Sequence, residues 1–264
     1  MNTNDAVLLT TAGEVATLTL NRPEVRNAID DAMRVDFIAA IDRVARDKAI
    51  RALVITGNGK AFCAGGDIRS MRERMQAPPG EIAFNGWCRQ QRTHYAVAAL
   101  HKLGKPTVAA VNGAATGLGC DLALCCDFIV ASEAASFAMT YILRGLIPDG
   151  GGLYFLPRRV GLARAKELIY TGRKVAAAEA LTLGMVDRVC SADRLLADAG
   201  AWAAELGQGS PAALALSKSI LDQTFELSAE QVFALGSQAQ AICYTSAEHH
   251  ASVAAFLDKG AARK

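Results

Sequence analysis

Residues 53–67 read Leu-Val-Ile-Thr-Gly-Asn-Gly-Lys-Ala-Phe-Cys-Ala-Gly-Gly-Asp, and this stretch decides the predicted fold. The continuous apolar run at residues 52–55 is typical of a strand buried on both faces, and residues 57–59 predict the turn that follows it. A short strand is predicted at residues 61–63, and a helix opens at Asp67. The stretch therefore predicts one buried strand and one short strand followed by a helix.

The neighbouring segments continue this alternation. Residues 15–20 alternate apolar and polar side chains, as a half-buried strand does, and residues 29–44 have the spacing of an amphipathic helix. A strand at residues 107–111 leads into a helix from about Gly117, and another strand follows at residues 128–130. Alternating strands and helices predict an α/β architecture in which helices cover the strands.

Strand patterns fade after Val189, and helical patterns replace them. We therefore predict two parts: a core at residues 1–200 that carries the active site, and a helical region at residues 201–264. The helices predicted for the end of the chain span residues 192–206, 211–225, 229–241 and 247–257.

The composition describes a globular chain with little net charge. Of its 264 residues, 52% are hydrophobic and 6% aromatic, and 28 Lys and Arg oppose 26 Asp and Glu for a formal net charge of +2. A chain of this length can bury a core without disulfide or metal staples. Nucleic-acid binding usually needs a concentrated positive field, which so small a charge does not provide, so we expect no nucleic-acid partner.

The sequence also predicts a cytoplasmic protein without a membrane partner. Residues 1–14 lack the basic stretch and apolar run of a signal peptide. The apolar stretches are interrupted by Asn112, Asp121 and Asp127 before they reach the ~18 residues that a spanning helix needs. The seven cysteines have no CxxC spacing, which favours reduced thiols over disulfides or zinc ligands.

Common cofactor motifs are missing from the sequence. Gly113, Gly117 and Gly119 do not form a GxGxxG fingerprint, and no P-loop, GxSxG or HExxH motif occurs. The four histidines have no Cys or carboxylate neighbours at metal-ligand spacing, and we interpret them as surface or capping residues. We expect neither a metal nor a cofactor of the protein's own.

Two glycine-bearing turns are the strongest candidates for a site. Residues 62–67 and residues 112–121 each follow a strand and open a helix. The first amides of a helix lack intrahelical partners and lie at the positive end of its dipole. If the turns face each other, one N–H from each can bind a developing oxyanion. The alternative is that both are ordinary tight turns, which are common before helices.

Four segments together resemble the enoyl-CoA hydratase/isomerase (crotonase) superfamily. They are residues 21–28 (Asn-Arg-Pro-Glu-Val-Arg-Asn-Ala), residues 53–67, residues 110–113 (Ala-Val-Asn-Gly) and residues 145–152 (Gly-Leu-Ile-Pro-Asp-Gly-Gly-Gly). The resemblance covers the chain from about Val15 to Lys259. It implies a spiral of ββα units with a C-terminal helical trimerisation region, assembled as a homotrimer or a dimer of trimers.

The resemblance also implies an acyl-CoA substrate whose thioester oxygen binds the backbone amides of Gly66 and Leu118. Coenzyme A is then part of the substrate rather than a cofactor. Its phosphates imply basic residues at the mouth of the site, although each basic residue could also be an ordinary solvated charge. The residues that match the family's CoA contacts are Arg26, Lys60, Ala64, Asp67, Ile68, Arg69 and Lys259, the last on a covering helix that is often a neighbouring subunit's.

Three side chains bear on the reaction that the resemblance implies. Where the family's hydratases carry two catalytic glutamates, this chain has Asp121 and Tyr141. A shorter carboxylate reaches less far, and a phenol with a pKa near ~10 is a poor base, so efficient hydration is not expected. Asp149 stands where double-bond isomerases of the family carry an aspartate and hydratases usually carry glycine. One carboxylate with a raised pKa can move a proton between two carbons.

We therefore expect an enoyl-CoA isomerase in which Asp149 moves the proton, Asp121 assists or orients, and Tyr141 lines the acyl pocket or holds a water. Residues 71–87 are predicted to form part of the pocket wall. Three alternatives stay open: Asp149 could instead cap the helix after Gly152, the enzyme could be a hydratase with Asp121 as acid and base, or the chain could be a non-catalytic acyl-CoA-binding subunit.

Overall fold

Two mostly parallel sheets share the chain, which passes from one to the other at each turn of a spiral. The computed structural model describes residues 5–261, with the backbone alone at residue 74 and residues 259–261. The first sheet has the spatial order β1 (Val7–Ala12), β2 (Val15–Leu20), β3 (Ala52–Gly57), β5 (Thr107–Val111), β7 (Phe128–Ser132) and β10 (Arg188–Cys190). The second sheet has the order β4 (Ala61–Cys63), β6 (Ala114–Thr116), β8 (Ser136–Ala138) and β9 (Val175–Ala176).

The chain steps between the sheets in the same way three times. β3 leads to β4, β5 to β6 and β7 to β8, and within each sheet these strands pair in parallel. The first step leads to α2 (Ile68–Arg74) and α3 (Pro79–His101), and the second to α4 (Leu118–Leu124). The third leads through the 3-10 turn η2 (Thr140–Arg144) to α5 (Gly152–Val160) and α6 (Leu162–Thr171). This repeat of two strands and a helix confirms the predicted α/β spiral of ββα units.

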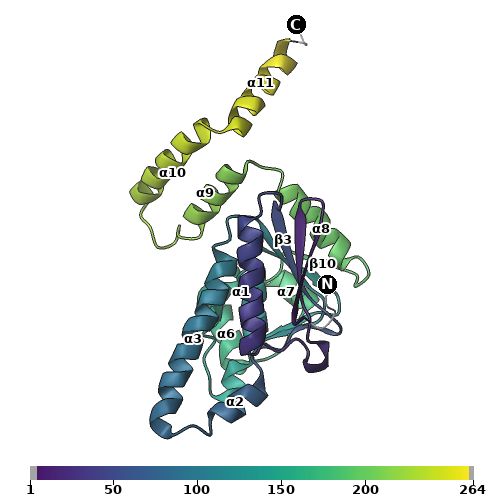
Figure 1. Ribbon diagram of the computed structural model, residues 1–264, viewed down its shortest axis with the longest axis vertical. Helices are drawn as coiled ribbons and strands as arrows, with labels where there is room; N and C mark the ends of the chain where they lie inside the picture. The colour runs from purple at the N-terminus through teal and green to yellow at the C-terminus, as the bar shows by residue number, and fades with distance from the viewer. Residues whose placement is uncertain (1–4, 262–264) are drawn as a thin grey trace.

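Helices cover both faces of the first sheet (Figure 1). Alternate side chains of a strand point to opposite faces, so β3 is buried along its whole length between two layers. Leu53 and Ile55 belong to the main core with α1 (Asp31–Arg46) and α3, whereas Val54 packs with α8 (Leu195–Leu206) in a second cluster. The continuous apolar run at residues 52–55 thus follows from the position of β3 inside the sheet.

The predicted division at residue 200 falls inside α8. Leu195, Ala199 and Ala203 of this helix are buried against the first sheet, so the helix belongs to the core on both sides of that residue. The packing therefore moves the end of the core from residue 200 to about Leu206.

The last three helices leave the core in succession. α9 (Pro211–Leu221) lies on the body, α10 (Ala229–Tyr244) packs on α9, and α11 (Ala247–Ala261) extends beyond it, as the yellow end of the chain in Figure 1 shows. Their positions agree with the predicted helical pattern. The remaining elements are the 3-10 turn η1 (Pro23–Val25) and α7 (Ala177–Thr182).

Asn27 ties η1 to the first ββα unit. Its side chain is fully buried, and Nδ2 lies 2.8 Å from the carbonyl oxygen of Ala61 and 3.1 Å from that of Phe62. Its Oδ1 accepts the Arg22 N–H at 2.8 Å, and its own φ is +57°, a conformation that asparagine tolerates better than most residues. The Asn-Arg-Pro…Asn-Ala segment therefore fixes the turn that precedes the candidate site.

We expect Asn27→Ala to lower the free energy of unfolding by about 2 kcal/mol or more, because the buried carbonyl groups of Ala61 and Phe62 lose their donor. Urea denaturation followed by circular dichroism measures this change. The control is Asn58→Ala, which removes an exposed side chain and should change the free energy of unfolding by less than about 1 kcal/mol. Equal effects of the two substitutions would contradict the assigned role of Asn27.

Candidate active site

The two glycine-bearing turns lie against each other. The Thr116 hydroxyl donates a hydrogen bond of 3.0 Å to the Ala64 carbonyl. A Cβ at Gly65 would lie 2.8 Å from the Thr116 carbonyl oxygen, and one at Gly119 would lie 2.2 Å from the Cys63 carbonyl oxygen. Any larger residue at either glycine would push the turns apart, so this contact explains the glycines that the sequence carries there.

An amide of each turn is open at this contact. Leu118 is the first residue of α4, and its nitrogen lies 3.4 Å from the point where a Gly65 Cβ would stand. Within residues 5–261, the N–H groups of Gly66 and Leu118 donate no hydrogen bond. Both residues line one cleft. Two open N–H groups on adjacent turns are the donor pair that an oxyanion requires.

The cleft beside these amides has a volume of about 480 Å³ and mainly apolar walls. It brings together Gly66, Ile68, Leu118, Tyr141 and Asp149, five of the residues predicted from the sequence. Further apolar side chains come from α2, α3 and the segment after η2: Met71, Met75, Ile82, Leu146 and Ile147. Several of these belong to residues 71–87, the predicted wall.

Asp149 lies in the turn between η2 and α5. The residue that precedes α5 is Gly151, and no side chain caps this helix, so Asp149 is not its cap. Burial raises the pKa of the Asp149 carboxyl, while a backbone hydrogen bond and the charges of His94 and Arg89 act in the opposite direction. A half-buried carboxyl with a raised pKa in an apolar cleft can both accept and return a proton.

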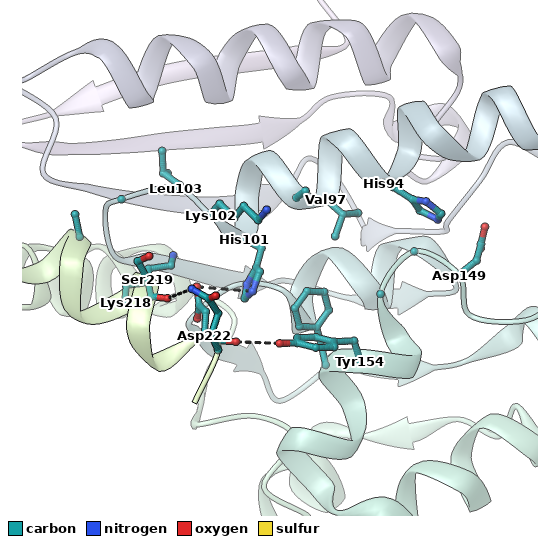
Figure 2. A pocket seen from close by; sticks show the side chains of 17 residues that line it. His94, Val97, His101, Lys102, Leu103, Asp149, Tyr154, Lys218, Ser219 and Asp222 are labelled. Atoms are coloured by element: carbon teal, nitrogen blue, oxygen red, sulfur yellow. Dashed lines mark hydrogen bonds and ion pairs between the residues drawn. The ribbon is translucent and has the colours of Figure 1, made fainter. Parts of the chain in front are cut away.

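Asp149 also borders a second cavity, of about 590 Å³, between α3, α5 and α9. Figure 2 shows His94 and Asp149 next to each other at one end of this cavity, and His101, Lys218 and Asp222 at the other. Two contacts fix the end of the cavity near Asp222 to the core. The Asp222 backbone carbonyl accepts a hydrogen bond of 2.9 Å from the Tyr154 hydroxyl, and the Lys218 amine donates one of 2.9 Å to the Asp127 carboxylate. These contacts hold α9 over the wall behind Asp149.

Asp121 has a different environment from Asp149. It is fully buried in α4 and is absent from the residues that line either cavity among those described. The Tyr141 hydroxyl donates a hydrogen bond of 2.5 Å to its Oδ2, so the tyrosine separates the carboxyl from the cleft. A Cβ at Gly150 or Gly152 would approach within 2.5 Å of this carboxylate, which shows how closely the Asp149 turn wraps around it.

Burial raises the pKa of Asp121 to about 7. The Tyr141 hydrogen bond and the nearby backbone of Gly150 and Gly152 lower it, although Oδ1 has no hydrogen bond of ordinary geometry. Burial and the adjacent carboxylate raise the pKa of the Tyr141 phenol above its ordinary value, so this hydroxyl stays protonated and acts as the donor. The Asp121–Tyr141 pair packs against the Asp149 turn. Of the two carboxyls, only Asp149 contacts the cleft among the described residues.

The residues predicted to bind CoA lie mostly around the first turn. The Ala64 N–H donates to the Arg26 carbonyl at 2.9 Å, which places exposed Arg26 beside the turn. The Asp67 carboxylate accepts the Arg69 N–H at 2.9 Å and pairs with Arg22 at 3.4 Å, so its side chain is already engaged within the chain.

The other predicted CoA contacts differ in position. Ile68 is 61% exposed at the edge of the cleft, and Arg69 next to it is exposed. Lys60 lies in the exposed turn between β3 and β4, where its carbonyl packs against Gly113. Lys259 is part of α11, and its side chain lies outside the described residues.

Three arginines line the cleft: Arg72 of α2 lies within the predicted wall, whereas sequence reasoning missed Arg89 of α3 and Arg144 of η2. Arg89 lies two residues beyond the segment predicted as pocket wall. The signal was present in the spacing of Ile82, Gly86 and Thr93, because residues three to four positions apart share one helix face. That face is the one α3 presents to the cleft.

Comparison with known proteins agrees with this geometry. The sequence profile described as "Enoyl-CoA hydratase/isomerase" matches residues 10–263. The 2,3-dehydroadipyl-CoA hydratase of Escherichia coli is 35% identical over 93% of this chain and 92% of its own length. The short-chain-enoyl-CoA hydratase of Clostridium acetobutylicum is 32% identical over 96% of this chain and 95% of its own length.

The chain belongs to the enoyl-CoA hydratase/isomerase family.

Solved structures of the same family have the same fold. The enoyl-CoA hydratase/isomerase of Cupriavidus metallidurans superposes with a TM-score of 0.89 at 34% identity, covering 97% of this chain and 94% of its own. The crotonase resemblance and the fold that it implied are therefore confirmed. Within the described part of the chain, no helix is long and apolar enough to cross a bilayer.

We expect the stability of this family member to depend on pH through Asp121. Its folded pKa of about 7 lies above the ordinary value of 3.8, so the folded state binds more protons between these values. The Asp121 contribution to the free energy of unfolding therefore falls as the pH rises through this range and is constant above it.

Asp121→Asn removes this dependence. Urea denaturation at several pH values should show wild type losing stability relative to the variant between about pH 4 and pH 7. Asp36→Asn, at an exposed position of α1, is the control and should follow wild type. Parallel curves for wild type and Asp121→Asn would rule out a raised pKa at Asp121.

Proposed function

We propose that this protein moves the double bond of an enoyl-CoA thioester by proton transfer at Asp149. The Asp149 carboxylate removes a proton from C2 of a 3-enoyl-CoA, and the thioester oxygen takes the negative charge of the dienolate. The same carboxyl then returns the proton at C4, which gives the 2-enoyl-CoA without net gain or loss of atoms. The Gly66 and Leu118 amides stabilise the oxygen in between.

One observation carries this proposal. Of the two neighbouring carboxyls with raised pKa values, Asp149 lines the cleft with Gly66 and Leu118, whereas Asp121 is bound behind Tyr141. Double-bond migration needs only one carboxyl that can reach the substrate. Hydration uses two acid–base groups, one to activate the water and one to deliver a proton to a second carbon. The arrangement therefore favours double-bond migration.

Hydration of 2-enoyl-CoA is the second candidate, and the names of the relatives favour it. The Escherichia coli and Clostridium acetobutylicum proteins are both named as hydratases. In this chain hydration would have to use Asp149 with Tyr141, or Asp121 after movement of Tyr141. Both candidates place the acyl-CoA at the same amides, so they differ only in the proton chemistry.

We also propose that the protein assembles through its last helices and works in a reducing, cytoplasm-like compartment. Large apolar side chains are exposed on α10 and α11, including Phe233 at 72% and Phe256 at 79%. Exposed apolar surface of this extent usually marks an interface, and a trimer or a dimer of trimers would bury it. All seven cysteines are free, which agrees with a reducing environment.

Asp149→Asn should slow the isomerisation of a 3-enoyl-CoA by about 10²-fold or more in kcat/KM, because the amide cannot accept the proton. The increase in ultraviolet absorbance of the conjugated 2-enoyl thioester measures the rate. Binding of a saturated CoA ester, measured by calorimetry, should be nearly unchanged. Unchanged turnover in the variant would overturn the proposal.

Crotonyl-CoA separates the two candidate reactions. We expect wild type to hydrate crotonyl-CoA more slowly than it isomerises a 3-enoyl-CoA. Tyr141→Phe keeps the aromatic ring, and this variant should hydrate crotonyl-CoA as slowly as wild type. Rapid hydration that is lost in Asp121→Asn would instead establish the hydratase. Binding of CoA esters with no turnover of any enoyl-CoA would establish the non-catalytic alternative.

A further inference from the structure

Asp149 lies at the boundary between the acyl cleft and the second cavity, and α3 forms a wall of both. Gln90 and Thr93 of this helix line the cleft, whereas His94 and Val97 line the cavity. Residues three or four positions apart share a helix face, so a single face of α3 borders both spaces. A carboxyl at this boundary meets an acyl group on one side and the side chains of the cavity on the other.

His94 lies on the cavity side of Asp149. Figure 2 shows the two side chains next to each other at one end of the second cavity. His94 is exposed, and its imidazole forms no hydrogen bond or ion pair with the other residues of the described chain. Its charge lowers the pKa of the Asp149 carboxyl, and does so more strongly than the charge of Arg89. His94 is therefore near enough to act on Asp149 and is also in contact with solvent.

The other ionisable groups near Asp149 lack one of these properties. The guanidinium of Arg89 keeps its proton, and the carboxyl of Asp121 is fully buried behind Tyr141. An imidazole, in contrast, accepts and releases protons near neutral pH. The remaining ionisable side chains of the second cavity lie toward its opposite end in Figure 2, and they are His101, Lys102, Tyr154, Lys218 and Asp222.

We propose that His94 relays protons between Asp149 and solvent. The inference rests on the proposed function, in which the Asp149 carboxyl holds the C2 proton while the dienolate exists. During this interval the carboxyl gives its proton to the His94 imidazole, and the imidazolium releases it to water. A solvent proton then returns through the imidazole to Asp149, so one proton leaves, one enters and the charge is unchanged. The product therefore carries a solvent hydrogen at C4.

Isomerisation in heavy water tests the relay. Mass spectrometry measures the deuterium in the 2-enoyl-CoA formed at low conversion, and NMR locates it at C4. Wild type should place solvent deuterium at C4 in most product molecules. His94→Gln keeps a polar side chain that cannot take up a proton, so its ratio of solvent deuterium to retained hydrogen should fall about tenfold or more. Isomerisation should continue, because Asp149 then returns the proton that it removed.

A matched variant and a labelled substrate make the result specific. His101→Gln removes the same kind of side chain from the opposite end of the same cavity, and should keep the wild-type ratio. A 3-enoyl-CoA dideuterated at C2, used in ordinary water, should carry more deuterium to C4 with His94→Gln than with wild type. Thermal unfolding confirms that both variants are folded. A purely structural effect would slow turnover without moving these ratios.

The outcomes separate this inference from the proposed function. Wild-type product without solvent deuterium at C4, or equal ratios in wild type and His94→Gln, would overturn the relay while the isomerisation stands. Loss of turnover in His94→Gln as complete as in Asp149→Asn would also overturn it, because a relay leaves Asp149 able to move the proton alone.

Failure of the proposed reaction gives a different pattern. If no 3-enoyl-CoA is isomerised, the C2 hydrogens of the recovered substrate decide the relay. Exchange of these hydrogens with heavy water in wild type, lost in His94→Gln, would sustain the relay although the proposed reaction fails. Absence of exchange in wild type would overturn both.

Discussion

Close backbone contact between two strand-to-helix turns is the constraint on which the site depends. The turn after β4 and the turn after β6 touch through Gly65 and Gly119, positions where a side chain would meet backbone at 2.8 Å and 2.2 Å. Parallel pairing of β4 with β6 brings the turns to the same edge of the second sheet. The Leu118 amide is open because the first N–H groups of a helix lack intrahelical partners, and the Gly66 amide lies in the turn just before the N-cap of α2.

Two carboxyls lie near this edge, Asp121 and Asp149, and they differ in how deeply they are buried and in whether they contact the cleft. Asp121 accepts a hydrogen bond from Tyr141 and is closely surrounded by the Asp149 turn. Asp149 is half-buried at the junction of two cavities, where it can meet an acyl group. Both pKa values are raised for the same physical reason, yet contact with the cleft distinguishes them.

The polar side chains of the N-terminal half support the site more than they form it. Asn27 binds carbonyl groups at the start of β4, and Asp67 caps α2 while pairing with Arg22. These contacts fix the backbone of the first turn, which agrees with a binding mode that uses main-chain groups. Arg89 is different, because it lines the cleft itself, from α3.

The sequence by itself determined the fold and most of the cleft. The apolar run of β3 and the paired glycine turns predicted the α/β architecture from local pattern, and the resemblance of four segments to the crotonase superfamily implied the ββα spiral and five residues that line the cleft. Strand β1 and the short strands β6, β8, β9 and β10 were not predicted; the short strands have two or three residues, too few to show a period by themselves.

Only the tertiary structure decided which groups meet. It placed Tyr141 between Asp121 and the cleft, extended the core through α8 and brought Arg89 beside Gly66. These relations join segments far apart in the chain, and no periodicity records them. Their physical basis is burial and distance, which exist only once the sheets and helices have packed together.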